Sequence, residues 1–101
     1  MVSPRVRAYL KFIGANVYRR RVRQDLTQEA LAEASRLDVR FLRRVERGAV
    51  NLRFDTIVRL AEALGVEPGA LLRRVKAPAP KAGRPRKTVR SRRSGPSSPP
   101  S

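Results

Sequence analysis

Residues 27–48 read TQEALAEASRLDVRFLRRVERG and contain two short amphipathic helical patterns separated by a tight turn. The first pattern follows Thr27, whose hydroxyl can accept hydrogen bonds from the amides of the first helical turn. The second follows Asp38, another residue that commonly caps helices, and Gly48 supplies its C-terminal stop. The second pattern places apolar residues on one face and arginines on the other. Such a helix can pack on a small core while it presents cations to a polyanion.

Three further helical patterns surround this pair, and no run of alternating β-branched residues predicts a strand. We therefore predict an all-α domain of five helices over residues 1–75, because proline is absent between Pro4 and Pro68 and apolar residues recur at helical spacing. The helices are expected at about 5–23, 28–34, 39–47 and 54–64, with a fifth beginning at Pro68, where a missing N–H does no harm. The residues expected to face the core are Val6, Leu10, Ile13, Val17, Ala30, Leu31, Ala34, Leu42, Val45, Ile57, Leu60, Ala61, Leu64, Leu71, Leu72 and Val75. The aromatic residues Phe12, Phe41 and Phe54 are expected to pack in or near this core.

Composition excludes several classes of chemistry. The 101-residue chain has no cysteine and no histidine, so disulfides, zinc-finger ligation and a histidine general base are ruled out. Ser3, Ser35 and Thr56 have no base partner suggested by the sequence, so we predict neither an enzyme nor a cofactor or metal site. No apolar run approaches the roughly 18 residues needed to span a bilayer, and no secretory signal is evident. We expect a soluble, cytoplasmic protein without a small-molecule ligand pocket.

The charge of the chain is strongly positive, with 24 basic and 8 acidic residues and a formal net charge of +16. Residues 76–101 hold 8 of the basic residues and no acid, and residues 1–75 hold the rest. Such an excess binds phosphate backbones with a steep dependence on salt. Double-stranded DNA is therefore the expected partner, and association with the nucleoid the expected location. The alternative is a charged surface that serves solubility alone.

The C-terminal segment, residues 76–101, is rich in proline, serine, lysine and arginine and has little apolar surface to bury. We predict that it is a disordered basic tail. Within it, residues 83–87 (GRPRK) resemble the core of an AT-hook, in which proline keeps the chain extended and flanking cations enter a narrow minor groove. The residues expected in the groove are Arg84, Pro85, Arg86 and Lys87. A generic basic tether is the alternative.

Residues 13–72 resemble the phage repressor and Cro-like helix-turn-helix proteins, also called the XRE family. The resemblance lies in residues 27–32 (TQEALA), 46–48 (ERG), 55–57 (DTI) and 60–66 (LAEALGV), in that order and at the spacing of the family. It implies a five-helix domain whose third helix enters the DNA major groove while the second lies across the backbone.

Matching positions to the family implies roles for individual side chains. The residues that fall where the family reaches base edges are Val39, Arg40 and Arg44. Those that fall on phosphate-contacting positions are Gln28, Arg43, Arg47 and Asn51. Arginine can donate two hydrogen bonds to guanine, and valine offers an apolar surface suited to a thymine methyl.

The resemblance also implies an internal ion pair between Arg21 and Glu46. Three positions depart from the family pattern. Arg36 stands at the turn where glycine is usual, Asp38 replaces a neutral hydroxyl residue, and Arg53 stands where a polar residue usually caps the fourth helix. A non-glycine residue with positive φ costs roughly 1 kcal/mol.

The function predicted from these observations is a sequence-specific DNA-binding transcriptional regulator, with repression as the default action. A homodimer is expected from the family and from spare apolar residues, namely Val2, Val6, Leu10 and Val75. One alternative is an architectural DNA binder of low specificity, which the basic tail favours. Another is a protein-interaction module for an acidic partner, which the unusual Arg36 and Asp38 suggest.

Overall fold

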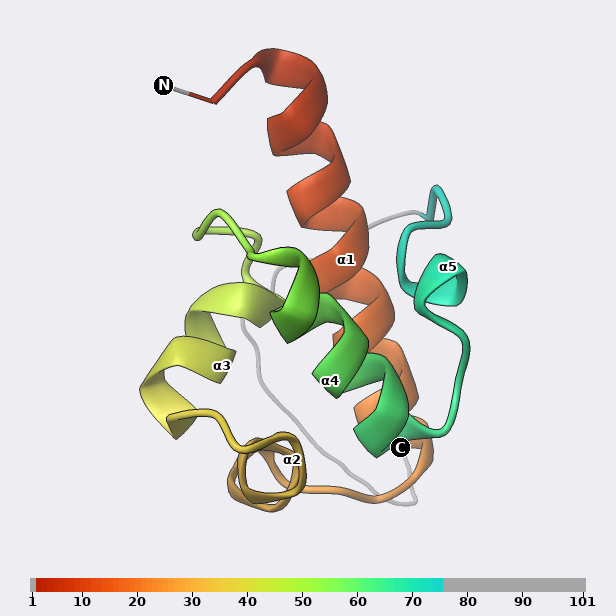
Figure 1. Ribbon diagram of the computed structural model, residues 1–101. Coiled ribbons are helices and arrows are strands. Elements are labelled where there is room, and N and C mark those ends of the chain that lie inside the picture. The colour runs from red at the N-terminus through yellow and green to blue at the C-terminus, as the bar shows by residue number, and fades with distance from the viewer. Residues whose placement is uncertain (1, 76–101) are drawn as a thin grey trace, which may run out of the picture.

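The computed structural model describes residues 2–75, which contain five α-helices and no strand. The helices are α1 (Pro4–Arg23), α2 (Gln28–Ser35), α3 (Val39–Glu46), α4 (Phe54–Leu64) and α5 (Pro68–Leu71). The long α1 runs the height of the molecule, and α3 and α5 lie on opposite sides of it (Figure 1). The all-α, five-helix prediction is confirmed. The predicted basic tail, with residues 83–87, lies outside the described part of the chain.

The helix ends follow the capping residues seen in the sequence. The Thr27 hydroxyl accepts a hydrogen bond from the amide of Ala30 at 2.9 Å. Asp38 accepts one from the amide of Arg40 at 2.7 Å. Gly65 ends α4 in the left-handed conformation, with φ of 73°. The predicted third helix reached Arg47, but Arg47 is the C-cap and α3 ends one residue earlier. Short-range hydrogen bonds of this kind define where each helix begins and ends.

A single apolar cluster joins all five helices. Its largest side chains with almost no solvent exposure are Val17, Leu31, Leu42, Val45, Leu60 and Leu71. They come from α1, α2, α3, α4 and α5, so each helix contributes at least one fully buried residue to the same core. Most of the residues expected to face the core therefore do so.

The buried face of α2 differs from the prediction. Ala30 and Ala34 are exposed, whereas Leu31, Ala32 and Ser35 are buried. Successive residues of a helix point about 100° apart, so a helix that buries positions 31, 32 and 35 turns positions 30 and 34 toward solvent. The hydroxyl of Ser35 is satisfied inside the core, because it donates to the carbonyl of Leu31 at 2.6 Å.

Three other expected core residues are exposed. The first turns of α1 extend beyond the other helices (Figure 1). Val6, two residues after the start of α1, is 42% exposed. Phe54 is 70% exposed because it is the first residue of α4, and the first residues of that helix to be buried are Thr56 and Ile57. Leu72 is 36% exposed, since its neighbour Leu71 already points inward. Phe12 and Phe41 are half-buried.

The segment after α5 is tied to α1 by a buried amide. Asn16 of α1 donates hydrogen bonds from Nδ2 to the carbonyl of Leu71 at 3.0 Å and to that of Arg73 at 2.9 Å. These bonds satisfy a buried polar side chain and fix residues far along the chain onto α1.

A glycine allows α1 and α3 to approach closely. A Cβ added to Gly14 would overlap the main-chain carbonyl oxygen of Val45 and lie 2.8 Å from that of Glu46. Both atoms belong to the backbone at the end of α3, where no side-chain rotation can relieve the overlap. The position of α3 against α1 therefore depends on the absence of a side chain at residue 14.

We predict that Gly14→Ala lowers the free energy of unfolding by about 1–3 kcal/mol, the usual cost of overpacking a core. Urea unfolding followed by circular dichroism would measure it. Gly69→Ala is the matched control, because no atom lies within 4 Å of a Cβ added there. That variant should be neutral or slightly more stable, since alanine favours helix more than glycine does. Equal stability of Gly14→Ala and the unmodified protein would contradict the close approach.

Candidate nucleic-acid interface

The outward face of α3 carries a stripe of arginines. Leu42 and Val45 are 0% and 1% exposed and fix the inward face of the helix. The exposed residues on the other side, at intervals of three and four, are Arg40, Arg43, Arg44 and Arg47. Residues at this spacing are neighbours on a helix surface, so the arginines form one continuous cationic strip.

Val39, the third predicted base-contacting residue, is half-buried and packs against the core. Only part of its side chain is therefore available at the start of α3. Asn51 lies exposed in the loop between α3 and α4, and its neighbours Val50 and Leu52 pack against the core. This packing anchors the loop on both sides of Asn51.

A buried ion pair holds the end of α3 against α1. Arg21 donates from Nε to Oε2 of Glu46 at 2.6 Å and from Nη2 to Oε1 at 3.1 Å. The side chains are 12% and 6% exposed, so water screens the pair little. Arg21 also donates from Nη1 to the carbonyl of Leu26 at 2.8 Å, in the link between α1 and α2. One guanidinium thus connects three parts of the domain, which makes Arg21 a scaffold residue within the Arg19-Arg20-Arg21 run.

Gln28 extends this network to the exposed face. Its Nε2 donates to Oε1 of Glu46 at 3.0 Å, and its Oε1 accepts from Nε of Arg43 at 3.2 Å. Arg43 also pairs with Glu29, at 3.4 Å between Nη2 and Oε2. Gln28 therefore bridges the buried pair and an exposed arginine, a role that sequence analysis missed. Nothing in the sequence marks it, because its partners lie 15 and 18 residues away.

The Gln28 and Arg43 side chains keep donors that these bonds do not use. Gln28 has a second amide hydrogen, and arginine carries five N–H donors, of which those on Nη1 of Arg43 make no hydrogen bond within residues 2–75. Both side chains can therefore remain in the network and still donate to an anion outside the protein.

The turn between α2 and α3 contains the departures noted in the sequence. Arg36 adopts the left-handed conformation, with φ of 59° and ψ of 46°, in a place where glycine would be unstrained. Asp38 is exposed, but its carboxylate caps α3 and lies at the positive end of the helix dipole. Arg53 precedes α4 without a side-chain capping bond.

Residues 2–75 contain no group of three or more acidic side chains placed to hold a metal ion. None of the five helices combines the length and the apolar character needed to cross a membrane.

We predict that Arg21→Gln lowers the free energy of unfolding by about 3–5 kcal/mol, because it leaves the buried carboxylate of Glu46 without its partner charge. The matched control is Arg53→Gln, which breaks the Arg53–Asp55 pair, whose side chains are 85% and 61% exposed. Its effect should stay under about 1 kcal/mol. Urea unfolding of both variants measures the difference. Similar losses for the two would show that the buried pair does not hold α3.

The arrangement of helices matches known proteins. A family model described as helix-turn-helix matches residues 17–71, more than half of the chain. The restriction-modification controller protein C.AhdI from Aeromonas hydrophila is 39% identical over 61% of this chain and 94% of that one, with a TM-score of 0.60. The hypothetical transcription factor NHTF from Neisseria is 32% identical over 64% of this chain and 73% of that one, with a TM-score of 0.63.

The clp gene regulator ClgR from Corynebacterium glutamicum is 28% identical over 63% of this chain and 68% of that one, with a TM-score of 0.61. No curated protein sequence matches the chain. The family model and these regulators also bear out the expectation that the protein is not an enzyme. The chain belongs to the helix-turn-helix family of the phage repressor and Cro (XRE) type, whose members are DNA-binding transcription regulators.

Proposed function

We propose that this protein is a sequence-specific transcriptional repressor that inserts α3 into the DNA major groove and binds a two-fold symmetric site as a homodimer. The observation that carries the proposal is the exposed arginine strip of α3, held in place by the buried Arg21–Glu46 pair. A helix fixed to its scaffold at one face can offer the other to a groove with little loss of conformational entropy.

In this proposal, Arg40 and Arg44 read the base sequence. They are exposed and four residues apart, so their side chains lie on the same side of α3. Each guanidinium can donate two hydrogen bonds to O6 and N7 of a guanine, and each such pair discriminates against other bases by about 1–3 kcal/mol. The accessible part of Val39 contacts a thymine methyl.

The phosphate contacts come from the rim of the same surface. Gln28, Arg43, Arg47 and Asn51 are assigned to this role, because cations and amides position a protein on the duplex without reading sequence. The bond between Gln28 and Arg43 supports the assignment, since it restrains both side chains before DNA binds. Arg84, Pro85, Arg86 and Lys87 of the tail are assigned to the minor groove from their sequence alone.

Repression follows as the simplest action of such a domain, because a protein bound over a promoter excludes other proteins from the same duplex. A DNA-bound regulator acts in the cytoplasm, at the nucleoid.

A selection of bound sequences from a random duplex library at about 0.15 M salt tests the base-reading role. The full chain and a chain ending at Val75 should both select a palindromic motif, and an additional A·T tract with the full chain would support the minor-groove tail. Arg40→Ala/Arg44→Ala should lose the motif while it keeps weak binding to any duplex. The matched control, Arg5→Ala/Arg7→Ala, removes the same charge from exposed positions of α1 and should retain the motif.

Two outcomes would support other functions. The net charge of +16 also suits an architectural DNA binder, and a specificity ratio below about tenfold would favour that function, since regulators typically exceed roughly 10³. Unchanged DNA binding by Arg40→Ala/Arg44→Ala would favour a protein-interaction module for an acidic partner.

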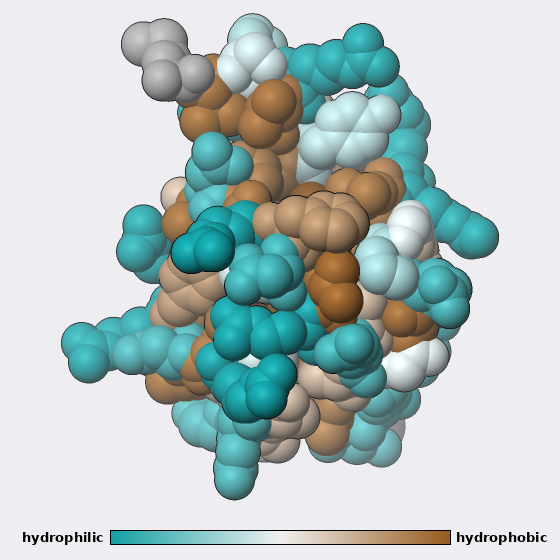
Figure 2. Space-filling view, viewed as in Figure 1, coloured by the Kyte–Doolittle hydropathy of each residue, from teal (hydrophilic) through white to brown (hydrophobic). Residues whose placement is uncertain are grey.

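The homodimer is supported by apolar surface that the domain leaves exposed. Hydrophobic residues come to the surface over the upper part of α1 and the start of α4, whereas hydrophilic residues project over α2 and α3 (Figure 2). Val6, Tyr9 and Phe54 are 42%, 37% and 70% exposed. Of the apolar residues thought to be surplus to the core, Leu10 is buried and Val2 packs against the core, so those two give no support.

We predict a dimer by sedimentation, and Phe54→Ser should weaken it because burial of a phenylalanine stabilises an interface by about 1.5–3 kcal/mol. Val22→Ser is the matched control: Val22 is 47% exposed but lies near the other end of α1. A monomeric mass, both alone and on the selected DNA, would rule out the dimer.

A further inference from the structure

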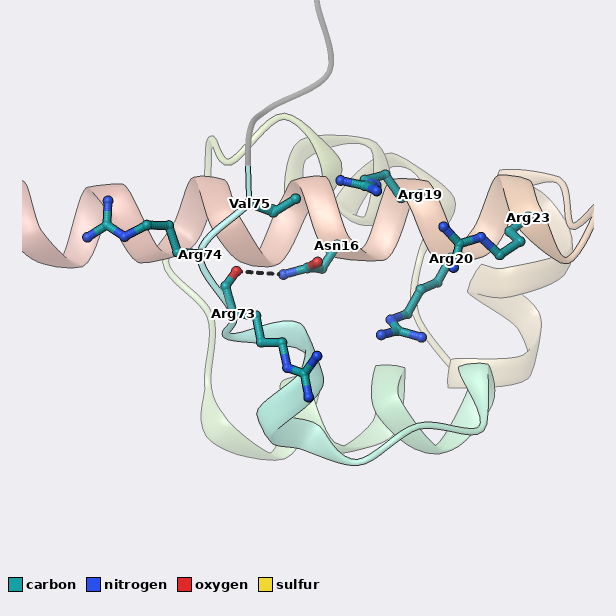
Figure 3. Close-up of a pocket in the computed structure, with 7 residues that line it drawn as sticks. All are labelled: Asn16, Arg19, Arg20, Arg23, Arg73, Arg74 and Val75. Atoms are coloured by element: carbon teal, nitrogen blue, oxygen red, sulfur yellow. Dashed lines mark hydrogen bonds between the residues drawn. The ribbon is translucent and has the colours of Figure 1, made fainter.

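The structure contains a cavity that the sequence did not indicate. Its volume is about 150 Å³, and it lies between the second half of α1 and the segment that follows α5 (Figure 3). It is lined by Asn16, Arg19, Arg20, Arg23, Arg73, Arg74 and Val75. None of these residues belongs to α2, α3 or the loop between α3 and α4, so the cavity is separate from the arginine strip of α3.

The side chains that line the cavity are mostly cationic, and they form no ion pairs within residues 2–75. Five of its seven lining residues are arginines, and none of them forms an ion pair with a carboxylate within residues 2–75. Residues 76–101 contain no acidic side chain. Guanidinium groups that face the same cavity repel one another, and an anion between them relieves this repulsion.

Within residues 2–75, Arg20 and Arg59 each have a buried Nε atom without a hydrogen-bond partner, and of the two only Arg20 lines the cavity. The Nε atom of Arg20 is inaccessible to solvent and donates to no acceptor within the described residues. Buried donors are nearly always hydrogen-bonded, so an orphan beside a cavity points to an acceptor that occupies it. Arg20 and Arg73 extend to the same side of α1 (Figure 3). Two guanidiniums so placed can grip one oxyanion.

The backbone that forms one side of the cavity is held in place by contacts within the protein. The two hydrogen bonds from Asn16 hold the carbonyls of Leu71 and Arg73 onto α1. Arg74 is directed elsewhere, with its guanidinium 5.1 Å from the centre of the Phe12 ring. This contact anchors the far end of the segment, so the backbone that carries Arg73 is held at both sides.

We propose that this cavity binds the phosphate end of a small ligand, such as the diphosphate group of a nucleotide or free pyrophosphate. Arginine forks match the geometry of phosphate oxygens, and several can share one group. The volume is below the roughly 300–1,000 Å³ that encloses a whole drug-sized ligand, so only the phosphate groups enter. A recessed donor such as Nε of Arg20 favours a small ligand over a duplex, whose backbone contacts protruding side chains.

Titration of the full chain with inorganic pyrophosphate, followed by nuclear magnetic resonance at about 0.15 M salt, tests this proposal. The Nε–H signal of Arg20 and the side-chain amide of Asn16 report on the cavity directly. Both should shift and saturate. Arg20→Gln/Arg73→Gln should weaken the response at Asn16 roughly tenfold or more, as expected when charge-assisted hydrogen bonds are lost. A nucleoside diphosphate should shift the same signals.

Controls separate the cavity from the overall charge. Arg5→Gln/Arg7→Gln removes the same charge from exposed positions and should bind pyrophosphate at the cavity as the unmodified protein does. Arg73→Gln alone serves if the double variant unfolds, because Asn16 bonds the backbone carbonyl of Arg73 and not its side chain. Equal weakening in both double variants, or no shift at Arg20 and Asn16, would overturn the proposal. So would shifts at these signals with a short random duplex but not with pyrophosphate.

Discussion

The contact between Glu46 and Arg21 joins the end of α3, which carries the arginine strip, to α1, the helix against which α3, α4 and α5 all pack. Charges removed from water need several hydrogen bonds to offset the loss of hydration. Here the carboxylate accepts from Arg21 and Gln28, and Arg21 also reaches the Leu26 carbonyl. These partners lie on α1, on α2 and in the link between them. The same few side chains therefore orient both the C-terminal end of α3 and the N-terminal end of α2.

This network connects the interior of the domain with its proposed DNA surface. Gln28 contacts the buried Glu46 on one side and the exposed Arg43 on the other. The close approach at Gly14 places the end of α3 directly on α1, beside Glu46. The like charges of an arginine-rich helix repel each other, and this repulsion opposes the packing of the helix on the rest of the domain. The glycine contact, the apolar residues Leu42 and Val45 and the buried pair together keep it there.

Much of this structure could be predicted from the sequence, and the exceptions have physical reasons. The bounds of α4 agree with its apolar periodicity and with Gly65, because local signals decide where such a helix starts and stops. The buried face of α2 was predicted wrongly, since its three alanines fit either face and Ser35 gave no sign that its hydroxyl would bond within the helix.

The side-chain contacts between different helices were harder to predict from the sequence. The Arg21–Glu46 pair followed from a family resemblance, whereas the Gln28 bridge depends on side-chain positions that only the packed helices determine. The arginine cavity brings together residues more than 50 positions apart. Periodicity describes each helix alone, so it carries no information about which side chains meet across two of them.

Arg36 keeps a left-handed backbone at the turn between α2 and α3, where its side chain adds strain of roughly 1 kcal/mol. Glycine would relieve this strain, with part of the gain offset by the greater freedom of the unfolded chain. Replacement of this arginine by glycine would therefore be expected to make the folded protein more stable. The residue instead adds a positive charge immediately before the arginine helix, where it can speed the approach of a polyanion from a distance. Arg36 thus combines roughly 1 kcal/mol of backbone strain with an added positive charge beside the arginine strip.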